Sequence, residues 1–76
     1  MSLYNFITDN KKVVNTLFRN GLLSTSIINN YAIYQFYLDS IDNGNSKSMS
    51  IELIKDRYDI STKTVYQILK QFSESI

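Results

Sequence analysis

Six residues near the C-terminal end combine hydrogen-bonding and positively charged side chains at helical spacing: Ser61, Thr62, Lys63, Tyr66, Gln67 and Lys70. Their hydroxyl, carboxamide and ammonium groups suit non-covalent recognition of an anionic partner that presents hydrogen-bonding edges. No acidic residue occurs between Asp59 and Glu74, so this segment is positively charged although the chain carries a net charge of only +1. We therefore expect a binding surface here.

The sequence gives little support for a catalytic or a metal-binding function. The chain has no Cys and no His, which excludes disulfides, thiolate nucleophiles, most zinc and haem ligation, and the usual general base. Asp39 and Asp42 could share a cation, but no third ligand follows at a useful spacing. The loop 42–48 partly resembles a calcium-binding loop. When Gly44 is aligned with the glycine of that loop, however, Ile41 falls at one ligand position and Ser50 at the position of the bidentate Glu. We expect no enzyme, no metal and no cofactor.

Composition indicates one small folded domain spanning residues 1–76. The chain is 43% hydrophobic and 13% aromatic, which is too rich in core-forming residues for a disordered segment. Proline is absent, and glycine occurs only at Gly21 and Gly44, as expected of a mostly helical chain. The first residues lack a basic region followed by an apolar run, and no apolar stretch is long enough to span a bilayer. The expected location is the cytoplasm.

Apolar residues at helical spacing predict an all-α domain of four or five helices. The expected ranges are about Ser2–Asn20, Thr25–Asn43, Ser48–Tyr58, and Thr62 to near the C-terminus. The first range becomes two helices if it breaks near Thr8 and Asp9, a pair that could cap a new helix. On the last helix the apolar stripe contains Val65, Ile68, Leu69, Phe72 and Ile76.

The last two helices are separated only by Asp59, Ile60 and Ser61. Two helices joined by about three residues, one of them apolar, meet at a steep angle. Ile60 is expected to fill that angle, and Ser61 to cap the following helix. This arrangement turns Val65 and its stripe inwards, so the residues expected to face outwards are Thr62, Lys63, Tyr66, Gln67, Lys70 and Gln71.

The stretch "IELIKDRYDISTKTVYQILK", residues 51–70, resembles the bihelical unit of helix-turn-helix DNA-binding proteins. Its most specific part, "YDIS…TVYQIL", is similar to that family's aromatic-Gly-apolar-Ser turn followed by Thr-Val-Tyr and an apolar pair. The preceding helices resemble the wider group of small helical repressors that includes the Trp repressor. Two positions depart from the family pattern: Asp59 replaces the usual turn glycine, and Lys55 replaces an alanine that faces the second helix.

The resemblance implies a C-terminal helix-turn-helix at about residues 48–73 that binds double-stranded DNA in a sequence-specific manner and regulates transcription. Lys63 and Lys70 would pair with phosphates or guanine edges, and Gln67 would address adenine. Two other interpretations of the same residues stay open. The outer face is an ordinary solvated helix surface, or the corner is a non-catalytic protein-interaction module. If the corner does not bind DNA, the basic residues Lys11, Lys12 and Arg19 are the other option for phosphate contact.

The helix expected at 25–43 is apolar on nearly all sides, which a chain this small can hardly cover alone. We therefore expect a homodimer built on this helix, with contributions from Leu3 and Phe6. The alternative is the central helix of a compact monomer. The residues of the expected interface follow a heptad-like spacing: Tyr31, Tyr34, Leu38 and Ile41.

Overall fold

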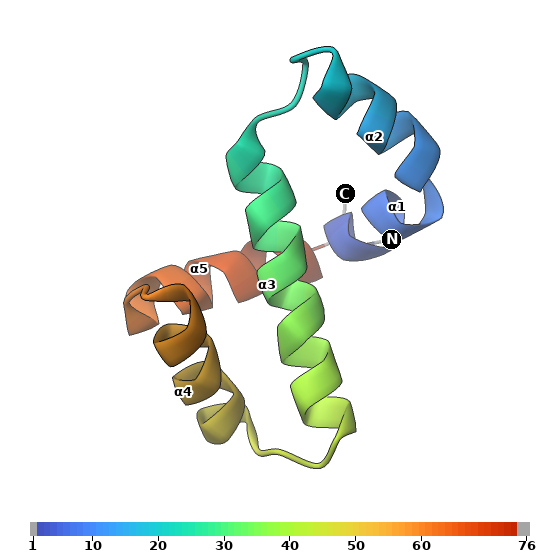
Figure 1. Cartoon of the computed structure of the whole chain (residues 1–76). Coiled ribbons are helices and arrows are strands. Elements are labelled where there is room, and N and C mark those ends of the chain that lie inside the picture. The colour runs from blue at the N-terminus through green and yellow to red at the C-terminus, as the bar shows by residue number, and fades with distance from the viewer. Residues whose placement is uncertain (1, 75–76) are drawn as a thin grey trace.

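The computed structural model describes residues 2–74, which form five helices and no strand within that range (Figure 1). The helices are α1 (Leu3–Asp9), α2 (Lys11–Arg19), α3 (Thr25–Asp42), α4 (Lys47–Tyr58) and α5 (Thr62–Ser73). The all-helical prediction is confirmed for these residues. Ile76, which was expected on the apolar stripe of the last helix, lies outside the described residues.

Four of the five helices begin at a serine that caps the first turn. The Oγ atom of each serine accepts a hydrogen bond from the backbone N–H three residues later, at 3.1 to 3.4 Å. A side-chain acceptor at this position satisfies a backbone donor that has no partner inside the helix. The capping serines are Ser2, Ser24, Ser46 and Ser61.

The segment 2–20 forms two helices, and the break expected near Thr8 falls at Asn10. The backbone of Asn10 departs from helical geometry (φ −122°, ψ 33°), and its Nδ2 atom donates to the carbonyl oxygen of Phe6 at 2.8 Å. The hydroxyl of Thr8 is engaged elsewhere: it donates to the carbonyl oxygen of Tyr4 at 2.9 Å and lies 2.8 Å from the hydroxyl of Tyr31. Asn10 therefore separates α1 from α2 and stands at the N-cap position of α2, in place of the expected Thr8–Asp9 pair.

The long helix α3 forms the axis of the molecule, and the other helices lie around it (Figure 1). At one end α4 packs beside the C-terminal half of α3, and α5 crosses α3 from the α4 side towards α1. The N–H of Leu3 donates to the carbonyl oxygen of Glu74 at 3.2 Å, which joins the start of α1 to the end of α5. The buried core residues are Ile7, Val14, Ile33, Ile51, Ile54, Val65, Ile68, Leu69 and Phe72.

Two residues of the expected dimer interface are used inside the chain. Tyr31 stacks on Tyr4 with ring centroids 5.3 Å apart, and Tyr34 stacks on Phe72 at 5.8 Å. Both tyrosines are only partly exposed and pack against the core. The apolar sides of α3 that carry them are therefore covered by α1 and α5 of the same chain. Any contact with a second copy must rely on other residues.

Candidate nucleic-acid interface

The turn between α4 and α5 depends on a left-handed residue, Asp59 (φ 53°, ψ 51°). Its N–H donates to the carbonyl oxygen of Lys55 at 2.9 Å, which closes the last turn of α4. Asp tolerates this backbone region better than most residues because its short side chain interacts locally. The two helices are therefore distinct elements, and the chain turns between them over residues 59–61 so that α5 runs across the direction of α4 (Figure 1).

The first turn of α5 is held by two interactions of Ser61. Its Oγ atom accepts from the N–H of Thr64 at 3.2 Å and lies 3.0 Å from the hydroxyl oxygen of that residue. These bonds order the turn before any partner binds. The hydroxyl of Ser61 therefore serves as the N-terminal cap of α5, and Thr64 beside it is half-buried.

The inner face of α5 anchors the helix in the core, as the sequence predicts. Val65 and Phe72 are fully buried, and Ile68 and Leu69 are nearly so. The outer face is exposed along its whole length, with Tyr66 at 48% exposure. Its exposed residues are Thr62, Lys63, Tyr66, Gln67, Lys70 and Gln71. The structure therefore places five of the six expected site residues on one solvent-facing side of α5, while the sixth, Ser61, caps the start of the helix.

Lys47 extends this surface although it belongs to another helix. It is the first residue of α4, and its Nζ atom lies 5.4 Å from the centre of the Tyr66 ring. A cation over an aromatic face is attracted by the negative charge of the ring face. The surface formed by the outer face of α5 and the start of α4 therefore has three lysines, Lys63 and Lys70 from α5 and Lys47 from α4, beside an aromatic ring and a carboxamide. Sequence reasoning missed Lys47 because it lies nineteen positions before Tyr66.

The side chain of Lys55 is directed along its own helix. Its Nζ atom lies 3.4 Å from the Oε1 atom of Glu52, three residues earlier on the same helix. The aliphatic stem is half-buried while the charge stays in solvent, as long basic side chains commonly arrange themselves.

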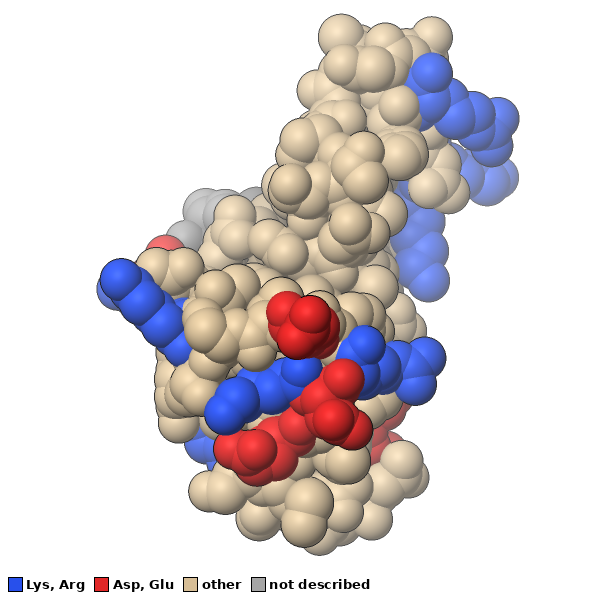
Figure 2. Space-filling model, turned by 60° about the vertical axis from the view of Figure 1, so that its left-hand side comes forward, with Lys and Arg blue, Asp and Glu red and all other residues tan. Residues whose placement is uncertain are grey.

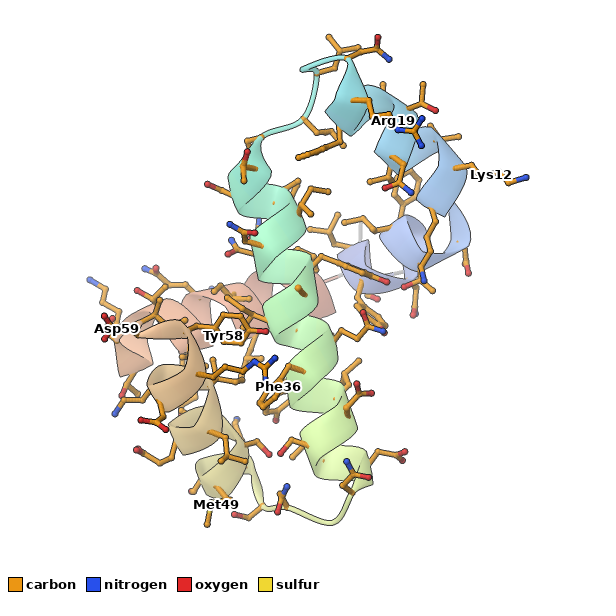
Figure 3. The ribbon with its side chains drawn as sticks, in the orientation of Figure 1. Lys12, Arg19, Phe36, Met49, Tyr58 and Asp59 are labelled. Carbon is orange, nitrogen blue, oxygen red and sulfur yellow. The ribbon has the colours of Figure 1, made fainter. Side chains whose placement is uncertain are left out.

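Aromatic side chains hold the C-terminal end of α4 against α3. Phe36 of α3 and Tyr58 of α4 meet edge to face with their ring centroids 6.1 Å apart (Figure 3). The guanidinium carbon of Arg57 lies 5.2 Å from the centre of the Phe36 ring and 5.8 Å from that of Tyr58. Such pairs add stability beyond the buried area. The corner that presents α5 is thus held by α3 as well as by its own core.

Charge is distributed unevenly over the surface. Figure 2 shows acidic and basic side chains next to one another where α4 comes forward, in the lower part of the view. Lys and Arg stand without acidic neighbours along one edge of the upper lobe, which contains α2. The exposed cations of α2 are Lys11, Lys12 and Arg19. The chain therefore has two cationic surfaces, the outer face of α5 and that of α2.

Other kinds of site are not found in the part of the chain that the structure describes. Over residues 2–74, no three acidic, His or Cys side chains gather as metal ligands would, and Asp39 and Asp42 remain a pair. Within the same range, no helix has both the length and the apolar character needed to cross a membrane.

Comparison with protein families, with characterised proteins and with solved structures finds no significant match for this chain.

Proposed function

We propose that this protein is a transcriptional regulator that binds double-stranded DNA in a sequence-specific manner, with α4 and α5 acting as a helix-turn-helix. In this proposal α5 enters the major groove and α4 crosses above it. The observation that carries the proposal is the outer face of α5. It combines Lys63 and Lys70 with hydroxyls, carboxamides and an aromatic ring, Lys47 of α4 lies over that ring, and no acidic residue occurs within the helix.

The size of α5 supports this role. Twelve residues span about 18 Å, and a helix with side chains is about 10–12 Å wide, which matches the width of the major groove. The buried stripe from Val65 to Phe72 holds the helix in one orientation, so its outer side chains can address bases without first becoming ordered.

The outer residues divide into two roles. Lys47, Lys63 and Lys70 contribute phosphate attraction, which does not depend on base sequence and weakens as salt rises. Gln67 contributes base contacts, since a carboxamide can bond both N6 and N7 of adenine. The exposed N–H groups at the start of α5 add a further phosphate contact. Together these groups give both general affinity and discrimination between sequences.

A second copy of the chain completes the proposal. One 12-residue helix reads only a few base pairs, whereas a symmetric homodimer reads two half-sites about 34 Å apart on one side of the duplex. The expected operator is therefore a palindrome.

Fluorescence anisotropy on two labelled duplexes tests the proposal: one selected by the wild-type protein from a randomised pool, the other of random sequence. Gln67→Ala is expected to weaken binding to the selected duplex by about 1–3 kcal/mol and to leave random DNA unaffected. Lys70→Ala is expected to weaken both alike and to lower the slope of log K against log salt by about 1. Gln35→Ala is the matched control, because Gln35 is exposed on α3, away from the proposed interface.

Two results would contradict this assignment. If Lys12→Ala lowers the salt slope while Lys70→Ala does not, the DNA-binding surface is α2. If the wild-type protein binds neither duplex at low salt, the DNA proposal fails, and the helical corner is left as a protein-interaction module.

A further inference from the structure

A cavity opens in the angle between the N-terminal half of α3 and the corner where α4 meets α5. Its volume is about 390 Å³, within the range of about 300–1,000 Å³ that is usual for small-molecule sites. In Figure 1 the N-terminal half of α3 extends past this corner. Tyr58 and Ile60 line the cavity from the corner, and residues of α3 line it from the other side. The cavity therefore touches the segment that sets the orientation of α5.

The wall formed by α3 carries polar groups. Asn29 and Asn30 lie three and four residues after Ser26, so the three side chains share one face of the helix. No hydrogen bond to another described residue engages the carboxamide of Asn29 or Asn30, whereas Asn10 and Asn20 donate theirs to carbonyl oxygens four residues earlier. Each carboxamide of the wall therefore has an acceptor oxygen and two N–H donors available for a ligand.

The rest of the lining is apolar, and no charged residue contributes to it among those that the structure describes. Its apolar part consists of Ala32, Ile33, Tyr58 and Ile60. Arg57 and Asp59 flank Tyr58 in the sequence but do not line the cavity, and the guanidinium carbon of Arg57 lies 5.2 Å from the centre of the Phe36 ring. A charged ligand would lose its hydration here without gaining an ion pair, so the lining favours a neutral one.

The two kinds of lining define the class of ligand. A carboxamide pairs best with a group that presents an N–H beside a C=O, because each partner then donates one hydrogen bond and accepts one. Primary amides, lactams and nucleobases have such an edge. The apolar side chains suit a flat ring, which gains contact area at a low cost in conformational entropy. The cavity thus matches a small, neutral ring compound with an amide-type edge.

A ligand of this kind would contact α3 and the corner at the same time. It would bind most tightly at the separation between Asn30 and Ile60 that the folded chain adopts, and would therefore stabilise that arrangement. Since Ile60 immediately precedes Ser61, the residue that caps α5, an occupied cavity also restrains the start of α5.

We propose that this cavity is a binding site for a small, neutral, planar ligand, with Asn29 and Asn30 bonding its amide-type edge and Ile60 packing against its ring. The site does not require that α5 bind DNA. Its tests use no DNA, so its failure is distinct from failure of the DNA-binding proposal.

Three probes of nearly equal size test the site at neutral pH: benzamide, benzoate and benzamidine. Benzamide is neutral with donors and an acceptor, benzoate is an anion with acceptors only, and benzamidine is a cation with donors only. In spectra of the ¹⁵N-labelled protein, the backbone amide signals of Ala32 and Ile60, one from each wall, are expected to shift with benzamide along one binding curve. The side-chain amide signals of Asn29 and Asn30 should shift with them. Both ions are expected to bind at least about 10-fold more weakly.

A pair of variants separates the carboxamide from general effects of substitution. Asn30→Leu keeps the size of the side chain and removes its donors and acceptor, so the dissociation constant for benzamide should rise by at least about 10-fold. Asn15→Leu is the matched control, because Asn15 is exposed on α2, which does not line the cavity. Both variants should keep the helical circular dichroism of the wild type, since neither side chain is fully buried.

Four results would overturn the proposal. The first is no shift with benzamide at tens of millimolar, and the second is equal binding of all three probes. The third is an Asn30→Leu variant that binds benzamide as tightly as Asn15→Leu does. The fourth is a set of shifts confined to Leu17 and Leu23, which would place benzamide in the smaller apolar hollow between α1, α2 and α3.

Discussion

The left-handed backbone at Asp59 allows a quantitative prediction about stability. A residue with a Cβ atom loses about 1–2 kcal/mol in this conformation, whereas glycine loses almost none. Glycine also gains freedom in the unfolded chain, which opposes folding by about 0.5–1 kcal/mol. The balance predicts that Asp59→Gly stabilises the fold by about 0.5–1 kcal/mol, and hence raises Tm by about 2–8 °C for a domain of this size.

Thermal unfolding followed by circular dichroism measures this effect, and two further variants separate its causes. Asp59→Asn keeps a side chain that tolerates the left-handed region and removes only the negative charge, so its Tm should stay close to that of the wild type. Asp59→Val introduces a β-branched side chain that the conformation strains, and its Tm should fall.

The charge of Asp59 offers a competing explanation that the same series can detect. The carboxylate lies at the C-terminal end of α4, where the helix dipole disfavours it. If Asp59→Asn melts above the wild type while Asp59→Gly melts at or below Asp59→Asn, the charge and not the backbone governs stability. The conformational argument would then be refuted. The hydrogen bond from the N–H of residue 59 to the carbonyl oxygen of Lys55 joins two backbone groups, so every variant keeps it.

Two more predictions concern the core and its tyrosines. Phe72→Ala should destabilise the fold by about 3–5 kcal/mol, because the side chain is fully buried against Tyr34, whereas Tyr66→Ala on the exposed face should have little effect in the same urea titration. Burial raises the pKa of the Tyr4 and Tyr34 hydroxyls above the usual value near 10. The folded state therefore holds these protons more tightly than the unfolded state, and stability should fall as the pH rises above about 10. A Tm that is constant across that range would contradict this assignment.

Features that depend on a few neighbouring residues could be predicted from the sequence. Ser61 caps α5 because its hydroxyl reaches a backbone N–H only three positions away. Gly21 ends α2 because its positive φ of 73° costs glycine little. The exposure of Gln67 and Lys70 follows from the buried stripe on the same helix. The helices and the exposed face of α5 could therefore be predicted from the spacing of residues in the sequence.

Contacts between distant segments could not be predicted in this way. The spacing of Tyr31 and Tyr34 indicates an apolar side of α3, but not whether the same chain or a second copy covers it. The answer depends on Tyr4 and Phe72, which come from opposite ends of the sequence. The position of Lys47 above α5 likewise depends on the angle between two helices.

The charge of the whole chain is a poor guide to nucleic-acid binding, because attraction at physiological salt acts over about 8 Å. The acids of α4 compensate its own cations, as in the pair of Glu52 and Lys55. At 100° per residue, Glu52 and Asp56 face the opposite side of α4 from Lys47, which lies over the Tyr66 ring. Phosphates beside α5 would therefore encounter mainly the lysines on its outer face. A net charge of +1 thus conceals a locally cationic surface, since the sign of the local field depends on which residues share a face.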